Sequence, residues 1–168
     1  MSADPDCGCP RTPRRYLHYH SRWKAHADSL ALEEATGQKL QAKIAALEAR
    51  GSAASDLADF AWLGAAQGQL FRARRCLSNS YVFAFYMFGT SMFDEISPEQ
   101  NKLNQNLFED NQADLEATVE QLSALVEADA DAIRNETRLL AVNLTALADT
   151  RCANLHQARM RIPIPIRI

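Results

Sequence analysis

The four cysteines and four histidines of this chain are the residues that could bind a metal or attack a substrate. Cys7 and Cys9 shortly precede His18 and His20. If the two histidines lie on a helix, their side chains point in nearly opposite directions, because they are two residues apart. Their spacing from the cysteines matches no standard zinc pattern. A zinc site made from these residues is therefore disfavoured, and we expect no metal or other cofactor in this chain.

Cys76 is a candidate nucleophile, because it follows a cluster of arginines, Arg72, Arg74 and Arg75. Positive charge nearby lowers the pKa of a thiol. However, no histidine is close in sequence to act as a base, so a small core residue on a helix is the favoured interpretation, and the arginines are expected on a solvated face. His156 is isolated in the sequence and expected to be exposed. The chain also has no Glu-x-x-His pair for a di-iron site, no phosphate-binding glycine loop and no nucleophile elbow. These residues alone favour an interaction or regulatory module over an enzyme.

Length and composition predict one helical domain. The chain has 168 residues, enough to bury a core, and only six glycines and six prolines. Its middle is rich in residues that favour helix. The net charge of −3 implies no general affinity for nucleic acid. The N-terminus has no apolar signal core, and the cysteines show no disulfide-framework spacing, so we expect a reduced, soluble protein of the cytoplasm, with the nucleus as an alternative, and no membrane contact.

The most apolar stretch, residues 72–93, is expected to be the central rod of a helical bundle. Its sequence RARRCLSNSYVFAFYMFGTSMF places large apolar groups on every side of a helix, so other elements should wrap it. It is too short to span a membrane. The expected core residues are Tyr81, Phe83, Phe85, Tyr86 and Phe88.

A long first helix is predicted from Pro13 to the Gly51 region, since proline suits a first helical turn. Its apolar stripe comprises Tyr16, Tyr19, Trp23, Leu30, Leu40, Ile44 and Leu47. His26, Glu33 and Gly37 interrupt this stripe. Such interruptions indicate either a functional surface or a helix that bends at Gly37 with Glu33 turned to water. The residues alone favour the bend.

Three further helices are predicted. One begins at Ser55 as its N-cap and continues into the central rod, and another begins at Ser97, which is followed by Pro98. The helix after Ser97 has an apolar stripe, Phe108, Leu115, Val119, Leu122 and Val126, and an acidic face, Glu109, Asp110, Asp114, Glu116 and Glu120. The last helix, starting near 129–131, carries Ile133, Leu140, Leu144, Leu147 and Leu155, and the short loop before it makes the two helices antiparallel neighbours.

The predicted fold class is therefore all-α: an elongated bundle of four long helices. Residues 1–13 form an irregular N-terminal segment, 14–158 the helical domain and 159–168 an extended C-terminal tail. Gly64 and Gly68 allow either a close helix approach or a bend.

Three strings in the chain are similar to the Ariadne domain, the C-terminal helical region of Ariadne-type RING-between-RING (RBR) ubiquitin-protein ligases. They are RYLHYHSRWKAHADSLALEE from Arg15, FRARRCLSNSYVFAFYMF from Phe71 and LFEDNQADLEATVEQLS from Leu107. The strings occur in the family's order, and the plant members look nearest. The resemblance covers Arg15 to Val126 well and the last helix weakly.

This resemblance implies a regulatory, autoinhibitory role in protein ubiquitination. In such ligases the Ariadne domain folds over the catalytic domain, which receives ubiquitin from a ubiquitin-conjugating enzyme, and a neddylated cullin-RING ligase releases it. A Phe-Glu pair and a second Glu make the autoinhibitory interface, and they fall here on Leu32, Glu33 and Glu120. Leucine replaces the aromatic residue, so that contact is expected to be weaker. The resemblance also favours Glu33 as a docking residue.

The family's zinc-binding cysteine arrays and catalytic cysteine should precede Arg15, and they are absent from this sequence. None of Cys7, Cys9, Cys76 and Cys152 can be given the thioester role. We therefore expect a fragment or truncated form that does not itself catalyse the transferase reaction of its family, the zinc belonging to the missing RING-like domains. The alternatives are a stand-alone helical interaction scaffold, which would use the acidic face, and a self-contained enzyme or metalloprotein.

Overall fold

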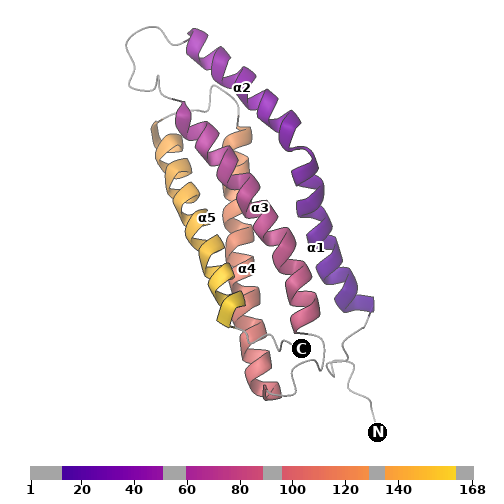
Figure 1. Cartoon of the computed structure of the whole chain (residues 1–168). Coiled ribbons are helices and arrows are strands. Elements are labelled where there is room, and N and C mark those ends of the chain that lie inside the picture. Colours follow the sequence, from indigo (N-terminus) through magenta and orange to yellow (C-terminus); the bar gives the residue numbers. More distant parts are fainter. Residues whose placement is uncertain (1–12, 51–59, 89–95, 129–134, 162–168) are drawn as a thin grey trace.

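The computed structural model describes residues 13–50, 60–88, 96–128 and 135–161, and all four segments are essentially helical (Figure 1). The helices are α1 (Pro13–Ala31), α2 (Glu33–Arg50), α3 (Ala61–Met87), α4 (Pro98–Glu127) and α5 (Asn135–Arg161). No strand occurs in these segments, so the all-α prediction is confirmed. The expected count of four long helices differs, because the first predicted helix is divided at Leu32 into α1 and α2.

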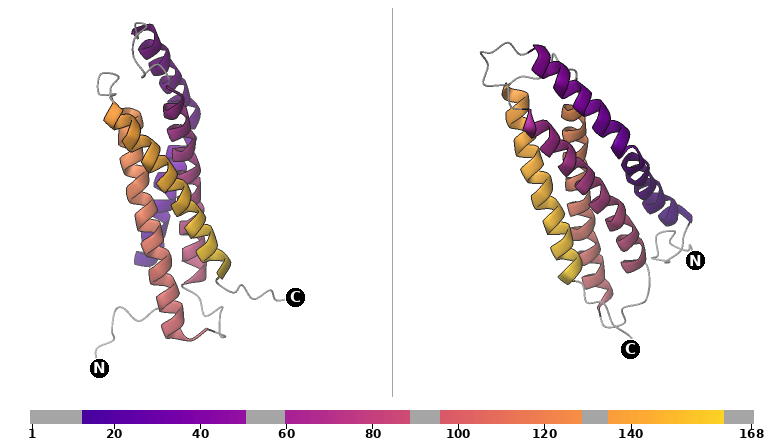
Figure 2. Two further views of the ribbon diagram at one scale, coloured as in Figure 1. Left: turned by 90° about the vertical axis from the view of Figure 1, so that its left-hand side faces the viewer. Right: turned by 45° about the horizontal axis from the view of Figure 1, so that its top comes forward.

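Helix α3 lies at the centre, in contact with each of the other four helices (Figures 1 and 2). Helices α3, α4 and α5 form a three-helix core in which α4 runs antiparallel to the other two. Helix α1 packs along the outer side of α3, and α2 continues past the far end of the core at a changed angle. The predicted antiparallel packing of the last two helices is therefore confirmed.

Helix α4 supplies the most regular part of the core. Ser97 caps its first turn, where the Ser97 Oγ accepts a hydrogen bond from the Gln100 backbone N–H at 3.2 Å, and Pro98 is the first helical residue. The predicted apolar stripe of this helix is buried in full: Phe108, Leu115, Val119, Leu122 and Val126. These side chains meet buried leucines of α3, including Leu63, Leu70 and Leu77. Spacing alone identified this face correctly.

The aromatic part of α3 is less enclosed than its composition predicts. Tyr81 and Phe88 are buried, and Phe83 and Phe85 are partly buried against the core. Tyr86, expected in the core, has 61% of its surface exposed. Tyr86 lines an open hollow together with Tyr16 and Trp23 of α1, which are themselves partly exposed. None of the described helices is long and apolar enough to cross a membrane.

Helix α5 buries a narrower face than predicted. Leu144 and Leu155 are buried, but Leu140 and Leu147 are largely exposed. Small residues between them, Ala141 and Ala148, are fully buried instead and let α5 approach its neighbours closely.

Some predicted boundaries lie outside the described residues, including the Ser55 cap, the irregular segment up to residue 12 and the tail from residue 162. Helix α3 is described from Ala61 and continues without interruption through Gly64 and Gly68. A Cβ atom at either glycine would meet nothing within 4 Å, so no helix approaches closely there.

Candidate functional site

Helix α1 is joined to α4 by polar contacts. Tyr19 is one of only two buried residues of α1, and its hydroxyl donates a hydrogen bond to the Glu109 carboxylate on α4. The Gln105 amide donates to the same carboxylate oxygen at 2.8 Å. Burial, together with the hydrogen bond to Glu109, raises the pKa of Tyr19 to about 12. Tyr19 is therefore a neutral hydrogen-bond donor at every physiological pH.

A second polar contact between α1 and α4 is a cluster of His26, Tyr81 and Glu116, which come from three helices. The buried His26 ring stacks on the Tyr81 ring with centroids 5.9 Å apart, and its Nε2 lies 3.5 Å from a Glu116 oxygen. The Tyr81 hydroxyl donates to the other Glu116 oxygen at 3.0 Å. The contact with His26 is the main reason that the pKa of Glu116 lies below its usual value, and Tyr81 acts in the same direction. His26, which interrupts the predicted stripe, is thus accounted for by this cluster.

These two sets of polar contacts fix the register of α1 along α4. In both pairs, Tyr19 with Glu109 and His26 with Glu116, the residue numbers differ by 90. A constant difference means that the two helices run in the same direction, with contacts repeating every seven residues or two helical turns. The acidic face predicted for α4 is therefore partly used inside the bundle.

The division between α1 and α2 falls at Leu32, which has 62% of its surface exposed. The Leu32 N–H donates to the Ser29 carbonyl at 3.3 Å, and the Leu32 carbonyl accepts from the Thr36 N–H at 2.9 Å. The backbone bonding thus continues through the corner with only a local change of direction. The predicted bend at Gly37 is wrong, since Gly37 lies inside α2.

Glu33 is the first residue of α2 and faces α3. Its carboxylate lies 3.5 Å from the Arg75 guanidinium, and both side chains are substantially exposed. The neighbouring arginines also have partners: Arg74 donates to the Ser123 hydroxyl at 2.8 Å, and Arg72 donates to the Gln69 amide oxygen. Arg72 and Arg75 are exposed, as expected for a solvated face, and only Arg74 is partly buried through its bond to α4.

Glu120 lies on α4, is exposed and is one turn beyond Glu116. With the register of 90, it is level with Leu30 on α1. A helix rises about 1.5 Å per residue, so Leu32 and Glu33 lie only about 3–5 Å further along the bundle. We call these three residues, Leu32, Glu33 and Glu120, the corner surface. The structure brings them to one level of the molecule and leaves their side chains accessible.

His18 and His20 contact neighbours on their own helix. The Arg22 guanidinium lies 3.1 Å from His18 Nδ1, and partial burial is the main cause that lowers the pKa of His18, with Arg22 acting in the same direction. His20 stacks on Tyr16 with centroids 5.0 Å apart. Across the described segments, no three His, Cys, Asp or Glu side chains converge as a metal site would require. Cys7 and Cys9 lie outside those segments.

One pair of reactive side chains was not predicted from the sequence. Cys152 on α5 and Cys76 on α3 line the same cavity, although 75 residues separate them in the chain. No local motif links the two positions, so only the packing of α5 on α3 reveals the pair. His156, one turn after Cys152, is exposed as predicted.

Comparison with known proteins gives a consistent result. The family model of the Ariadne domain matches residues 14–159. The chain is 43% identical over 152 residues to the probable E3 ubiquitin-protein ligase ARI2 of Arabidopsis thaliana, covering 88% of this chain and 25% of the relative. It is 41% identical to the probable E3 ubiquitin-protein ligase ARI1 of Arabidopsis thaliana, again covering 88% of this chain and 25% of the relative. It is 31% identical to the E3 ubiquitin-protein ligase ariadne-1 of Drosophila melanogaster, covering 68% of this chain and 20% of the relative. The chain thus spans about a quarter of the length of the plant relatives.

Proposed function

The chain belongs to the Ariadne domain family, and from this premise we propose that it is the regulatory domain of an RBR ubiquitin-protein ligase. In this proposal the domain docks on the ligase's catalytic domain and holds it inactive in protein ubiquitination. The catalytic domain, with its zinc ions, would receive ubiquitin from a ubiquitin-conjugating enzyme. Binding of a neddylated cullin-RING ligase would release it.

The observation that supports this proposal is the exposure of the corner surface. Leu32 is a large apolar side chain that is 62% exposed at a corner held by continuous backbone hydrogen bonds. Glu33 and Glu120 place two carboxylates at the same level. An accessible apolar group followed directly by a carboxylate, at a corner with continuous backbone hydrogen bonds, suits a protein-docking surface.

Breaking the ion pair of Glu33 with Arg75 to form one with a docked protein should cost little free energy. Its ion pair with Arg75 is exposed, with 44% of the Glu33 and 65% of the Arg75 side-chain surface accessible. Exposed pairs contribute only about 0–1 kcal/mol to stability. In a docked complex that excludes water, removing one partner of a charge pair costs about 2–5 kcal/mol. Glu33 should therefore matter far more for docking than for folding.

Titration calorimetry with the catalytic RING-like domain of Arabidopsis ARI2, supplied as a separate protein, tests the proposal. We expect the double variant Glu33→Ala/Glu120→Ala to raise the Kd at least about thirtyfold. Glu48→Ala/Asp110→Ala removes two exposed carboxylates from the same helices, α2 and α4, and should leave the Kd unchanged. Leu32→Phe restores the aromatic residue that the family resemblance implies at this position and should lower the Kd. Absence of binding, or equal loss in both double variants, would refute the docking role.

The alternative is a stand-alone helical scaffold that binds another protein through the acidic face of α4. Two carboxylates of that face, Glu109 and Glu116, accept hydrogen bonds from Tyr19 and Tyr81 and are not free to bind a partner. This use within the bundle counts against the scaffold. If the catalytic domain does not bind, the scaffold becomes the better explanation.

A further inference from the structure

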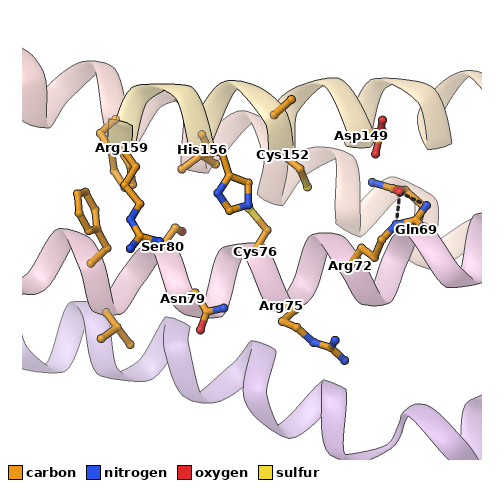
Figure 3. A pocket seen from close by; sticks show the side chains of 15 residues that line it. Gln69, Arg72, Arg75, Cys76, Asn79, Ser80, Asp149, Cys152, His156 and Arg159 are labelled. Atoms are coloured by element: carbon orange, nitrogen blue, oxygen red, sulfur yellow. Dashed lines mark hydrogen bonds between the residues drawn. The ribbon is translucent and has the colours of Figure 1, made fainter. Parts of the chain in front are cut away.

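An open cavity of about 760 Å³ lies between α3 and α5 (Figure 3). Two cysteines lie in its middle, Cys76 from α3 and Cys152 from α5 (Figure 3). Cavities of this size are in the range of small-molecule sites. The corner surface does not include any residue of this cavity, so a separate role for it can be considered.

The two cysteines are a pair of free thiols held together by the fold. Both are only partly buried, and they line the same cavity from facing helices. The nearby Cys152 side chain is the main cause that lowers the pKa of Cys76, while Cys76 in turn raises the pKa of Cys152. Cys76 is therefore the thiol that more readily becomes a thiolate, and the thiolate is the form that attacks.

The cavity wall carries groups that suit an anionic ligand. Arg72 and Arg159 flank the thiols on opposite sides along the helices, and Asp149 is the only carboxylate among the lining residues of the described chain (Figure 3). Gln69 lines the same wall and is 1% exposed. Its Oε1 accepts from Arg72, but its buried Nε2 has no hydrogen-bond partner. An unpaired buried N–H group is a donor available to a bound acceptor.

We propose that Cys76 and Cys152 form a redox-active dithiol that exchanges with a small anionic disulfide bound in this cavity. The Cys76 thiolate attacks one sulfur of the bound disulfide, whose S–S bond breaks and releases one small thiolate. Cys152 gives its proton to solvent and attacks the Cys76 sulfur, which expels the second small thiolate. The two cysteine thiols are oxidised to one disulfide between α3 and α5, and the small disulfide is reduced to two thiols. The arginines and the Gln69 amide bind the ligand's carboxylates.

Glutathione disulfide is the probe for the test, with the full chain carrying Cys7→Ser/Cys9→Ser so that only the proposed pair can react. Mass spectrometry of the intact protein and of its non-reduced peptides should show the loss of two hydrogens and a Cys76–Cys152 link. This measurement requires no substitution of a residue that lines the cavity. If the main product under these conditions has no Cys76–Cys152 link, the proposal is overturned.

The order of attack can be tested by trapping the mixed disulfide. In a Cys152→Ser variant the glutathione adduct should accumulate on Cys76, whereas Cys76→Ser should react at Cys152 at least about tenfold more slowly. Circular dichroism checks that both variants are folded, and alanine at the same positions replaces serine if either is not. Equal reactivity of the two cysteines would contradict the roles assigned to them.

A charged and an uncharged disulfide can be compared to test whether the cavity selects anionic ligands. Oxidation by glutathione disulfide should be about tenfold faster than by the uncharged bis(2-hydroxyethyl) disulfide at low salt, and the advantage should shrink as salt is added. Arg159→Gln should reduce this advantage, whereas Lys102→Gln, an equal loss of charge at an exposed position outside the cavity lining, should not. If the charged and uncharged disulfides react equally fast, the cavity does not select for anions and this proposal fails.

Discussion

Helices α4 and α1 both pack on α3, but they are attached by different means. Helix α4 buries eight residues, most of them in one continuous apolar stripe. Helix α1 buries only Tyr19 and His26, both with polar contacts to α4, while Tyr16 and Trp23 on its predicted stripe remain 50% and 37% exposed. The stabilisation from burying apolar groups is roughly proportional to the area buried, whereas the stabilisation from a hydrogen bond depends on the positions of a few atoms. The position of α1 should therefore be separable from the stability of the core.

The largest effect is expected from Leu115→Ala on α4. Leu115 is 0% exposed, so its truncation leaves a cavity and should lower the free energy of unfolding by about 2–5 kcal/mol. Denaturation by urea, followed by circular dichroism, measures this loss. Leu103→Ala, on the same helix but 51% exposed, is the matched control and should change stability by less than about 0.5 kcal/mol. Equal losses in the two variants would mean that the α4 stripe is not the main source of stability.

A smaller and more local effect is expected from Tyr19→Phe on α1. The change removes the hydroxyl that donates to Glu109, which should lower stability by about 1.5–3 kcal/mol, the usual range for a hydrogen bond to a charged group. Amide hydrogen exchange should become faster in α1 and stay nearly unchanged in α4. Tyr16→Phe, at an exposed position of the same helix, serves as the control. Uniformly faster exchange in all helices would show that α1 and the core open together.

The Glu116 cluster should make the attachment of α1 dependent on pH. The pKa of Glu116 is lowered from 4.5 in the folded chain, so its contribution to stability is present above about pH 4.5 and is lost as the pH falls through the folded pKa. Glu116→Gln lacks this ionisation. The stability difference between the original chain and the variant should therefore be largest near neutral pH and should shrink in acid. Urea denaturation from pH 7 to pH 3 measures it, and a difference that is constant with pH would contradict the role of the carboxylate charge.

The smallest effect on stability is expected from Glu33→Ala. The variant removes only an exposed ion pair with Arg75, so the free energy of unfolding should change by less than about 1 kcal/mol. Thermal and urea denaturation of this variant should nearly match those of the unchanged chain. A larger loss would mean that the corner between α1 and α2 stabilises the core, which would remove the proposed distinction between docking and folding residues.

Local patterns in the sequence predicted α4 far better than α1. The Ser97 cap and the α4 stripe depend on spacing within one helix, and both are present as predicted. Periodicity gives the apolar face of a helix but not how much of that face a neighbour covers. Tyr16 on α1 and Tyr86 on α3 are predicted on apolar surfaces, and both are largely exposed in an open hollow where the two helices meet.

Features that join distant segments could not be predicted from local patterns. The contact of Cys76 with Cys152, and that of His26 with Tyr81 and Glu116, depends on how the helices pack. The position of the corner was missed for a different reason. Gly37 looked like the weak point of the first helix, yet the chain turns at Leu32, and no described residue has a positive φ that would have required glycine there.

The single residue between α1 and α2 has a further consequence for how the chain tolerates changes in length. Each residue of a helix advances it by about 100°, so one residue inserted beside Leu32 would rotate the whole of α2 by that angle. Leu40, which is 3% exposed, would leave the core, and Lys43 would lose its hydrogen bonds to the carbonyls of Val126 and Ala128 at the end of α4. At this corner the number of residues, more than their identity, sets the direction in which α2 presents its side chains.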